Sequence, residues 1–486
     1  MKKLSVLIDA MHADDQSGSQ QIDIGELSMD SRRKTDNGLF FCVTGAAFDG
    51  HDYAKQAVEN GARAVVAERP VRDVPVPQVI VENTRVAMAL AAAEFYDHPD
   101  RQMKIIGLTG TKGKTTTSYL VQAILQHAGF ACGVIGTIGS TIGSRRLNSG
   151  LTTPDPIDLQ KTLRLMADEG ASYVAMEVSA HAIAYHRLEG MHFETGCFTN
   201  LSQDHLDFFG TMERYFDVKR SFMNSHFIGN AALNVDDERA PLVQKTMDVP
   251  CLSYGICAPA DVMAQDIEIS ENGVSFVMSV LNTDKYPVRL KLTGMFNVYN
   301  ALAAAAVCLN QGIDPADIAE GLSTLSAVPG RAEVLDTHTP YKVILDYSHS
   351  PDALENILNT VRGFTRGRVI ALFGCGGDRD HGKRPIMGEI GGRLADYCIL
   401  TSDNPRTEDP NAILASIEKG IRATKGEYTV IENRRDAIRH ALSIARDGDV
   451  VVLAGKGHET YQEINGVKRP FDEKAIVKEL LSEMNG

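Results

Sequence analysis

The chain has 486 residues, of which 43% are hydrophobic, so it is long enough for roughly three domains with sizeable cores. Its 49 basic and 63 acidic residues give a formal net charge of −14, which argues against nucleic acid as a partner. Eight cysteines without a C-x-x-C pair favour reduced, buried thiols over a disulfide or zinc framework. Asp9 soon interrupts the N-terminal apolar stretch, and no apolar run approaches the ~20 residues of a membrane helix. We therefore expect a cytoplasmic monomer with no signal peptide and no stable membrane insertion.

Strands and helices are predicted to alternate along the whole chain. Strands are expected at 38–43, 62–68, 104–108, 172–178, 196–201, 231–235, 341–347, 368–374, 396–402 and 449–455, with alternating strands and turns between about 261 and 293. Helices are expected at 53–61, 297–312 and 351–362. Apolar strands separated by helices indicate parallel sheets that are covered on both faces.

Two polar stretches divide the chain into three α/β domains. EFYDHPDRQ (94–102) and VPGR (328–331) are the expected boundaries. They give a small N-terminal domain at 1–99, a central domain with a parallel sheet at 100–331, and a Rossmann-like C-terminal domain at 332–486. Ligands of such sheets bind beyond the carboxyl ends of the strands, where the unusual residues of this sequence cluster.

The segment GLTGTKGKTTT (107–117) is a candidate phosphate-binding loop between a strand and a helix. Gly110 and Gly113 let the backbone N–H groups turn inward, and the start of the helix adds positive charge. Lys114 can reach the β- and γ-phosphates, and the Thr115 hydroxyl can hold Mg²⁺. A glycine-rich turn without a ligand would not explain this order of elements. The sequence therefore predicts an ATP site in the central domain.

A metal ion bound to a nucleotide needs ligands nearby, such as a carboxylate or a neutral imidazole nitrogen. Glu177 ends an otherwise apolar strand, the place for a carboxylate that faces Mg²⁺, and His205 follows the next strand. The alternative is that His205 is an ordinary hydrogen-bonded loop residue and that Asp204 and Asp207 are solvated loop charges.

Eight separate motifs together resemble the Mur ligase family, the amino-acid ligases of peptidoglycan synthesis. They are GTKGKTTT (110–117), MEVSAHAI (176–183), NLSQDHLDF (200–208), GMFNVYNALAAAA (294–306), VPGRAE (328–333), DYSHSPDAL (346–354), FGCGGDRDHGKRP (373–385) and AGKGHE (454–459). The segment MDSRRKTDNGLFFCVTGAAFDGHD (29–52) also resembles the family's UDP-binding domain, which folylpolyglutamate synthase lacks. The resemblance covers essentially the whole chain. Within the family, this sequence is most similar to the members that add the third residue of the peptide stem.

The resemblance implies an ATP-dependent ligase that joins meso-2,6-diaminopimelate to UDP-N-acetylmuramoyl-L-alanyl-D-glutamate. A carboxylate is a poor acylating agent, so the γ-phosphoryl group of ATP first converts it to an acyl phosphate, which the amine of the amino acid attacks. Catalysis of this kind rests mostly on positioning and on cations that stabilise negative charge.

The family positions imply a role for each site residue. The catalytic residues would be Lys114, Lys219, His205 and Glu177. ATP would be bound by Gly110, Thr111, Lys112, Gly113, Lys114, Thr115, Thr116, Asn297, Asn300, Arg331, Asp346 and His349. The UDP-muramoyl-dipeptide would be bound by Ser31, Arg32, Thr152, Thr153, Ser179, Arg187 and Lys219. Magnesium would be held by Thr115, Glu177, His205 and Lys219, the last carbamylated by CO₂.

Several of these residues also have a purely structural interpretation. Taken without the family, Lys219 would be an exposed helical lysine, Ser31 a turn residue and Arg187 a helix-surface charge. Asn297 and Asn300 lie one helical turn apart, so both could reach the adenine, but asparagine also caps helices well.

The segment TSDNPRTEDP (401–410) is where the added amino acid would be selected, because the family associates DNPR with meso-diaminopimelate. Arg406 could bind the second carboxylate of that amino acid through two parallel hydrogen bonds, whereas lysine would bring an ammonium group instead. The implied set is Arg379, Asp403, Asn404, Pro405, Arg406, Gly455 and Glu459, in which Asn404, Gly455 and Glu459 accept or orient the ammonium and Arg379 contacts the other carboxylate. Four alternatives remain: a ligase for lysine or another diamino acid, a turn before a helix with no ligand, a non-catalytic binding protein, and a P-loop kinase.

Overall fold

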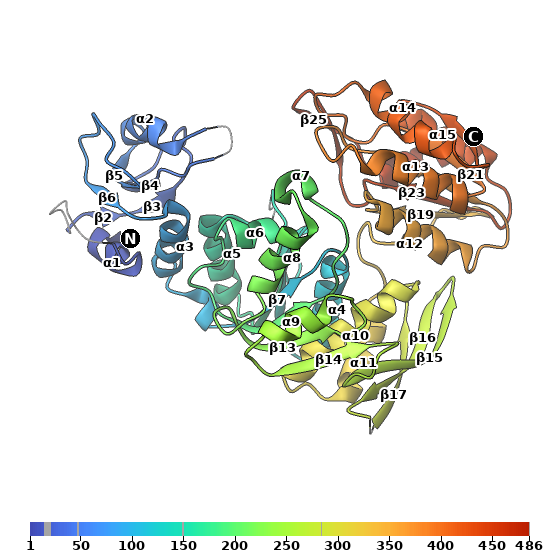
Figure 1. Cartoon of the computed structure of the whole chain (residues 1–486), viewed down its shortest axis with the longest axis horizontal. Helices are drawn as coiled ribbons and strands as arrows, with labels where there is room; N and C mark the ends of the chain where they lie inside the picture. Colours follow the sequence, from blue (N-terminus) through green and yellow to red (C-terminus); the bar gives the residue numbers. More distant parts are fainter. Residues whose placement is uncertain (14–20, 46–47, 148–149, 283, 486) are drawn as a thin grey trace.

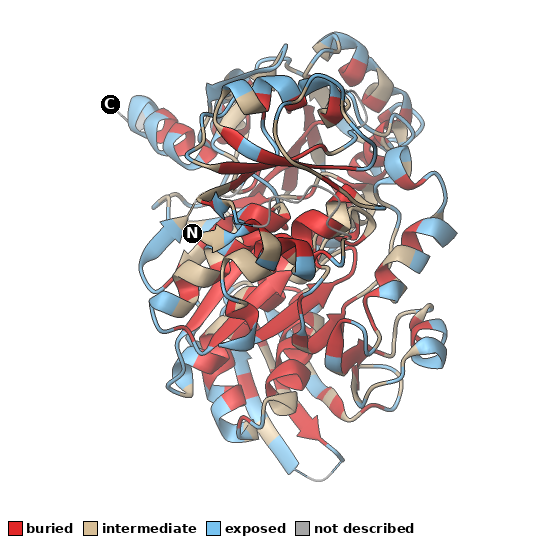
Figure 2. Cartoon of the chain, turned by 90° about the vertical axis from the view of Figure 1, so that its left-hand side faces the viewer, coloured by how far each residue is buried: buried red, intermediate tan, exposed pale blue. Residues whose placement is uncertain are grey.

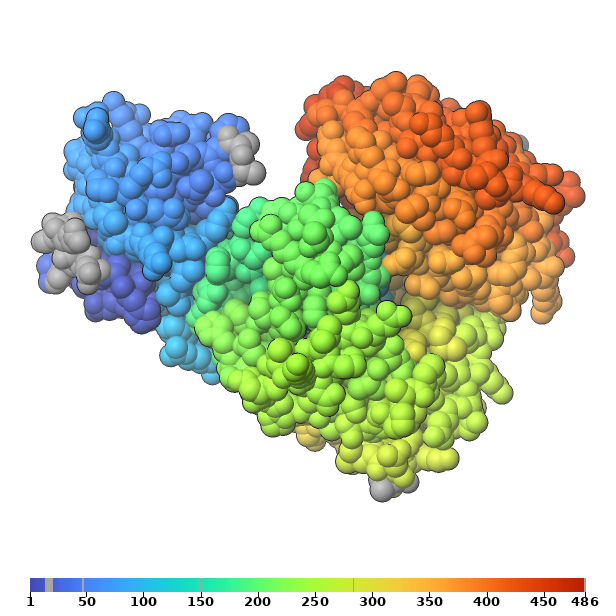
Figure 3. Space-filling model, viewed as in Figure 1, coloured from blue at the N-terminus to red at the C-terminus, as the bar shows by residue number. Residues whose placement is uncertain are grey.

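The computed structural model describes residues 1–13, 21–45, 48–147, 150–282 and 284–485, so residues 46–47 of the expected UDP-binding motif lie outside it. The chain forms three lobes, each built around its own main sheet (Figure 1). The N- and C-terminal lobes both adjoin the central lobe, and the face between them is hollowed (Figure 3).

The N-terminal lobe is a four-stranded parallel sheet in the order β3-β4-β5-β6, with helices on both faces. Helices α1 and α3 cover one face, and α2 covers the other. Its elements are β1 (Lys2–Lys3), α1 (Leu4–Ala10), β2 (Asp23–Ile24), β3 (Glu26–Ser28), β4 (Gly38–Phe41), η1 (Gly50–Tyr53), α2 (Ala54–Glu59), β5 (Ala62–Ala67), β6 (Gln78–Ile80) and α3 (Thr84–Phe95). The strands expected at 38–43 and 62–68 and the helix expected at 53–61 are confirmed.

The central lobe has an eleven-stranded sheet in the order β10-β9-β8-β11-β7-β12-β13-β14-β15-β16-β17. The strands from β8 through β11, β7, β12, β13 and β14 to β15 are parallel, and the outer strands are antiparallel. Its strands are β7 (Lys104–Thr109), β8 (Cys132–Gly136), β9 (Gly139–Ile142), β10 (Arg145–Leu147), β11 (Tyr173–Glu177), β12 (Phe193–Phe198), β13 (Ile228–Asn234), β14 (Cys251–Gly255), β15 (Val262–Ser270), β16 (Gly273–Val280) and β17 (Asp284–Leu290).

Helices cover both faces of the parallel part of this sheet. They are η2 (Pro99–Arg101), α4 (Lys114–His127), α5 (Pro156–Asp168), α6 (Ala180–Ala184), α7 (Leu206–Phe209), α8 (Met212–Ser221), α9 (Ala240–Thr246), α10 (Met295–Asn310) and α11 (Pro315–Thr324). The strand expected at 196–201 is displaced, because β12 ends at Phe198. Beyond it, Thr199 and Asn200 turn to the phosphate loop, where the Asn200 carbonyl accepts a hydrogen bond from Thr111 N at 2.8 Å.

The C-terminal lobe has a six-stranded sheet in the order β18-β19-β23-β20-β21-β22, parallel except for β18. Helices α12, α13 and α14 cover one face, and α15 and α16 cover the other. Its elements are β18 (Glu333–Leu335), β19 (Lys342–Asp346), α12 (Pro351–Arg362), β20 (Val369–Phe373), α13 (Lys383–Leu394), β21 (Tyr397–Leu400), α14 (Pro410–Ile421), β22 (Glu427–Val430), α15 (Arg434–Ile444), β23 (Val450–Ala454), β24 (Tyr461–Ile464), β25 (Val467–Pro470) and α16 (Glu473–Asn485). All four expected strands and the helix at 351–362 are confirmed.

The sheets form the buried interior of each lobe, and the outer sides of the helices are exposed (Figure 2). The alanine-rich run at 301–309 belongs to α10, which packs into the core of the central lobe. Among the described residues, no helix is both long and apolar enough to cross a membrane. All eight cysteines lie in the described ranges and are free thiols, but Cys257 is exposed, so the expectation of buried thiols is wrong there.

Candidate functional site

The phosphate loop joins β7 to α4, as the sequence predicts, and its two glycines are sterically required. Gly110 and Gly113 adopt φ of 138° and 88°, a region that side chains rarely enter. A Cβ atom at Gly110 would lie 2.0 Å from Thr199 Oγ1, and one at Gly113 would lie 2.4 Å from Asn300 Oδ1. The loop therefore presses its backbone against two neighbouring segments, which fixes the direction of its N–H groups.

The Lys114 ammonium group lies folded over this loop. Its Nζ donates hydrogen bonds to the carbonyls of Gly110 at 2.8 Å and Thr111 at 3.0 Å. Burial lowers the pKa of Lys114 to about 8. The adjacent Thr115 hydroxyl accepts a hydrogen bond from Arg331 Nη2 at 3.0 Å, which links the loop to the start of the C-terminal lobe.

A cavity of about 730 Å³ opens in front of the loop. Most of the expected ATP-binding residues line it, namely Thr111, Lys112, Gly113, Lys114, Thr115, Thr116, Asn300, Arg331, Asp346 and His349. Asn297 is placed behind this wall: its Nδ2 donates to the Thr293 carbonyl, and its Oδ1 accepts from Asn300 Nδ2 at 2.9 Å. Asn297 therefore orients Asn300 and does not itself face the cavity, contrary to our expectation that both reach the adenine.

Asp346 and His349 come from the end of β19 and from the loop that follows it. Burial raises the pKa of the Asp346 carboxyl, whose Oδ2 accepts from Ala332 N at 2.7 Å. Burial, Lys112 and Lys383 lower the pKa of His349 to about 3, so its ring is neutral. Its Nδ1 lies 2.8 Å from the Tyr347 carbonyl and must donate to it, which leaves Nε2 as an acceptor.

Glu177 presents a buried carboxylate to the same cavity from the end of β11, as expected. It accepts hydrogen bonds from the N–H and the hydroxyl of Thr137 at 2.8 and 3.0 Å. Neither of these donors carries a charge, and a carboxylate placed in this way is the kind of ligand that Mg²⁺ prefers. Among the described residues, no group of three or more His, Cys, Asp and Glu side chains could hold a metal ion, so such an ion would also need ligands of other kinds.

Lys219 is 1% exposed in α8, so its interpretation as a surface lysine is wrong. Its Nζ donates to the Gly110 carbonyl at 2.7 Å and lies 4.7 Å from the centre of the Tyr215 ring. Burial holds the pKa of Lys219 well below its ordinary value. CO₂ reacts with the amine form of lysine and not with its ammonium form, and the carbamylation of Lys219 stays a prediction.

Asp204 and His205 reach the cavity from the loop after β12. Asp204 pairs with Lys112 at 3.0 Å and its side chain is 16% exposed, so the alternative of a solvated charge is wrong for this residue. Asp207 is exposed, which agrees with the alternative that it is a solvated loop charge. The His205 side chain is 46% exposed and lines both this cavity and the next.

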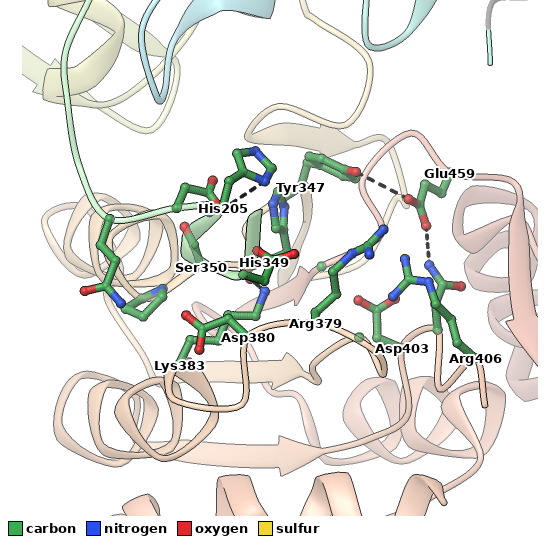
Figure 4. A pocket seen from close by; sticks show the side chains of 17 residues that line it. His205, Tyr347, His349, Ser350, Arg379, Asp380, Lys383, Asp403, Arg406 and Glu459 are labelled. Atoms are coloured by element: carbon green, nitrogen blue, oxygen red, sulfur yellow. Dashed lines mark hydrogen bonds and ion pairs between the residues drawn. The ribbon is translucent and has the colours of Figure 1, made fainter. Parts of the chain in front are cut away.

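A second cavity, of about 210 Å³, lies between this loop and the C-terminal lobe (Figure 4). Six of the seven expected amino-acid-binding residues line it, namely Arg379, Asp403, Asn404, Arg406, Gly455 and Glu459. Pro405 is buried beside them. Asp204, His205, Tyr347 and His349 line both cavities, so the two cavities have a common wall.

The side chain of Asn404 has a fixed orientation. Its Oδ1 accepts from Lys456 Nζ at 3.0 Å and from Glu463 N at 2.9 Å, and its Nδ2 donates to Glu459 Oε2 at 2.9 Å. Both partners of Oδ1 can only donate, so the amide cannot be reversed. Asn404 therefore orients Glu459 and cannot accept an ammonium with Oδ1, which leaves Asp403, Glu459 and the Gly455 carbonyl as candidate acceptors.

Arg406 has a left-handed backbone with φ of 52°. Its N–H donates to the Glu463 carbonyl at 3.1 Å, and its own carbonyl accepts from Asn465 N at 2.7 Å. Its Nη1 donates to the Gly377 carbonyl at 2.6 Å, and its Nε lies 3.6 Å from a Glu463 carboxylate oxygen. The hairpin β24–β25 thus holds this arginine on the wall of the cavity.

Tyr347 and Lys456 are site residues that the sequence did not single out. The Tyr347 ring lies 4.9 Å from the Arg331 guanidinium, and its hydroxyl donates to Glu459 Oε1 at 3.4 Å, so it touches the walls of both cavities. Lys456 has no exposed surface and lies 3.3 Å from both Asp403 and Glu459. Its place inside AGKGHE was the available signal, but only a structure shows that the ammonium points inward.

The residues expected to bind the muramoyl dipeptide are divided between two lobes. Thr152 and Ser179 line the larger cavity, and Thr153 lies behind them, donating to the Glu177 carbonyl at 2.8 Å. Arg187 is 12% exposed and pairs with Asp155 at 2.9 Å, so it is not a surface charge.

In the N-terminal lobe, Ser31 donates to Gln56 Oε1 at 2.8 Å and is buried. Arg32 is 82% exposed. Neither of these two residues lines either cavity.

A P-loop cavity that shares a wall with a pocket of arginines and carboxylates can bring a nucleotide and an amino acid together. This fold and site define an ATP-dependent, amide-forming ligase. Three family models match the chain: the Mur ligase family catalytic domain at residues 23–96, the Mur ligase middle domain at 108–308, and the Mur ligase glutamate ligase domain at 330–457. The chain belongs to the Mur ligase family.

Individual relatives agree over nearly the full length. The chain is 46% identical over 470 residues to the UDP-N-acetylmuramoyl-L-alanyl-D-glutamate–2,6-diaminopimelate ligase of Geobacillus thermodenitrificans, covering 95% of each chain. It is 43% identical over 471 residues to the corresponding ligase 1 of Clostridium acetobutylicum, covering 96% of each chain. A solved structure of a ligase with the same name is 31% identical, with a TM-score of 0.70 and complete coverage of both chains.

Proposed function

We propose that this enzyme adds meso-2,6-diaminopimelate to UDP-N-acetylmuramoyl-L-alanyl-D-glutamate, at the expense of ATP, in the synthesis of a peptidoglycan precursor. The observation that carries the proposal is the wall common to the two cavities, formed by Asp204, His205, Tyr347 and His349. An acyl phosphate formed at the nucleotide would lie within reach of an amine in the smaller cavity. A non-catalytic binding protein would not need Lys114 here, and a kinase would not need the second cavity.

The nucleotide half of the reaction depends on the phosphate loop. Its N–H groups and the Lys114 ammonium bind the β- and γ-phosphates and stabilise the charge that spreads during phosphoryl transfer. Thr115, Glu177, His205 and a carbamylated Lys219 would hold Mg²⁺, which would supply further positive charge at the phosphates. The low pKa of Lys219 supports carbamylation, because CO₂ reacts with the neutral amine.

The precursor would span the hollow that lies between the N- and C-terminal lobes, against the central lobe (Figure 3). Ser31 and Arg32 would meet the uridine end, and Thr152, Thr153, Ser179 and Arg187 would hold the muramoyl dipeptide, with its glutamate carboxylate directed at the γ-phosphate. This assignment gives the three domains their roles: 1–99 for the UDP-sugar, 100–331 for ATP and 332–486 for the amino acid. A monomer suffices for it, and the substrate ATP implies a cytoplasmic location.

The smaller cavity would bind the diamino acid. Arg406 would bind the carboxylate at the far end of diaminopimelate, and Arg379 would bind the other one. Asp403 and Glu459 would accept the ammonium beside that far carboxylate. Burial alone would raise the pKa of Asp403, but the charges of Lys456 and Arg434 outweigh it and hold the pKa below its ordinary value, so the carboxylate stays ionised.

Amino-acid specificity tests this proposal. The purified protein, given ATP, Mg²⁺ and the UDP-linked dipeptide, should release ADP and phosphate with meso-diaminopimelate and react poorly with L-lysine. A preference for lysine would reject the proposed substrate while leaving the ligase chemistry intact.

A further inference from the structure

An ion pair between Arg384 and Glu408 contacts the loops that line the amino-acid cavity. Arg384, in the first turn of α13, is 4% exposed, and its Nη1 and Nη2 donate to the two carboxylate oxygens of Glu408 at 2.9 and 2.8 Å. This hydrogen bonding lowers the pKa of Glu408 to about 2, so the pair stays charged at neutral pH. Neither residue lines the cavity, so neither is available to contact a ligand there.

The pair ties together the two loops that form the floor of the cavity. Glu408 also accepts a hydrogen bond from the backbone N–H of Asp378, and Arg384 Nη2 lies 3.4 Å from the Gly376 carbonyl. The Asp378 carboxylate in turn accepts from the N–H and the hydroxyl of Thr407, at 3.2 and 2.8 Å. Loop 376–380 and loop 403–408 are thus connected at several points.

Each of these loops carries one of the arginines that face the cavity (Figure 4). Arg379 has little support of its own: its guanidinium makes one long hydrogen bond, at 3.3 Å, to the carbonyl of Asp378. Hairpin β24–β25 holds the backbone of Arg406, and its Nη1 reaches across to the Gly377 carbonyl of the other loop at 2.6 Å. The position of loop 376–380, which carries Arg379, relative to Arg406 is therefore set by the contacts that connect the two loops.

We propose that Arg384 and Glu408 are positioning residues that set the separation of Arg379 and Arg406. They thereby select an amino acid with two carboxylates over one with a single carboxylate. This inference rests on the proposed function, because it assumes that the two arginines bind the two carboxylates of diaminopimelate. Lysine has one carboxylate and needs only one correctly placed guanidinium, so it should be insensitive to their separation.

The test is Arg384→Lys in the full-length enzyme, which keeps the charge but loses the paired hydrogen bonds. We expect the KM for meso-diaminopimelate to rise about tenfold, less than the roughly 100-fold effect that a 1 Å misplacement can have. The KM for ATP should not change, and neither should the inhibition constant of L-lysine, measured as a competitor of diaminopimelate. A merely structural role would weaken both amino acids together.

Two further variants make the test decisive. Glu408→Gln removes the other charge from a side chain that is 21% exposed, so it remains informative if Arg384→Lys folds poorly. It should reproduce the selective loss, and the double variant should be no worse than either single one, since both break the same contact.

Arg393→Lys is the matched control, because Arg393 lies in the same helix and pairs with Glu355 at 2.9 Å on the surface. It should leave every constant unchanged. Equal weakening of both amino acids, or no change, overturns the inference. Failure of the wild-type enzyme to use diaminopimelate would instead reject the proposed function.

Discussion

The selection of the second carboxylate by Arg406 gives the most quantitative prediction. We propose that Arg406 binds the far carboxylate of diaminopimelate, which lysine lacks. Replacing Arg406 with alanine should therefore remove a contact that diaminopimelate makes and lysine cannot make. Both residues have a Cβ atom, so the cost of φ 52° is the same in the two proteins and cancels from the comparison. The change therefore reports on the guanidinium group alone.

The magnitude follows from the surroundings of this side chain. It is 22% exposed, and in the absence of ligand its Nε lies 3.6 Å from Glu463, so part of its charge is already compensated. Truncating one member of a buried charged pair costs 2–5 kcal/mol, and these two features favour the lower part of that range. We expect a loss of about 2–3 kcal/mol, which corresponds to a rise of about 30- to 150-fold in the KM for diaminopimelate.

The assay is steady-state ADP release with diaminopimelate varied at saturating ATP and UDP-linked dipeptide. The KM for ATP should change little, because the phosphate loop lies in another lobe. Arg422→Ala is the control, since Arg422 pairs with Glu418 on the surface and is 66% exposed. An unchanged KM for diaminopimelate would show that Arg406 does not select the amino acid.

Three other predictions concern the nucleotide half of the site. Gly113→Ala places a Cβ atom 2.4 Å from Asn300 Oδ1, on a residue whose φ is 88°. The resulting strain of about 1–2 kcal/mol should raise the KM for ATP about 5- to 30-fold. An unchanged KM for ATP would show that the loop does not require glycine at this position. The pKa of Lys114, about 8 without ligand, should rise beside a triphosphate, so ATP binding somewhat above pH 8 should take up a proton. Calorimetry of ATP binding in two buffers of different ionisation enthalpy measures this proton uptake. Equal binding heats in the two buffers would contradict the prediction. Removal of CO₂ should lower the activity by about 10- to 100-fold if Lys219 works as a carbamate, and bicarbonate should restore it; activity that is independent of CO₂ would reject the modification.

Local patterns in the sequence were enough to predict many of the elements and the phosphate loop. The order of strand, glycines, Lys-Thr and helix specified the phosphate loop, because each part has one structural purpose. The alternating pattern near 261–293 correctly indicated strands. That β15, β16 and β17 extend the same sheet as β7 depends on pairing between distant segments, which a local pattern does not contain.

The errors at the site concern the directions of side chains. Asn297 and Asn300 share a face of α10, yet one hydrogen bond between them places Asn300 in front and Asn297 behind. Lys456 was not singled out within AGKGHE, but its buried ammonium fixes the orientation of the Asn404 amide. Such contacts join residues far apart in the sequence, so only the folded chain reveals them.

The central claim is that the γ-phosphoryl group of ATP passes to the carboxylate of the bound precursor before the amine attacks. The direct measurement is hydroxylamine trapping with enzyme, Mg²⁺, ATP and UDP-N-acetylmuramoyl-L-alanyl-D-glutamate in the absence of amino acid. The account predicts the hydroxamate of the precursor together with ADP. Release of AMP, or the absence of any trapped precursor under conditions where complete mixtures turn over, would contradict it.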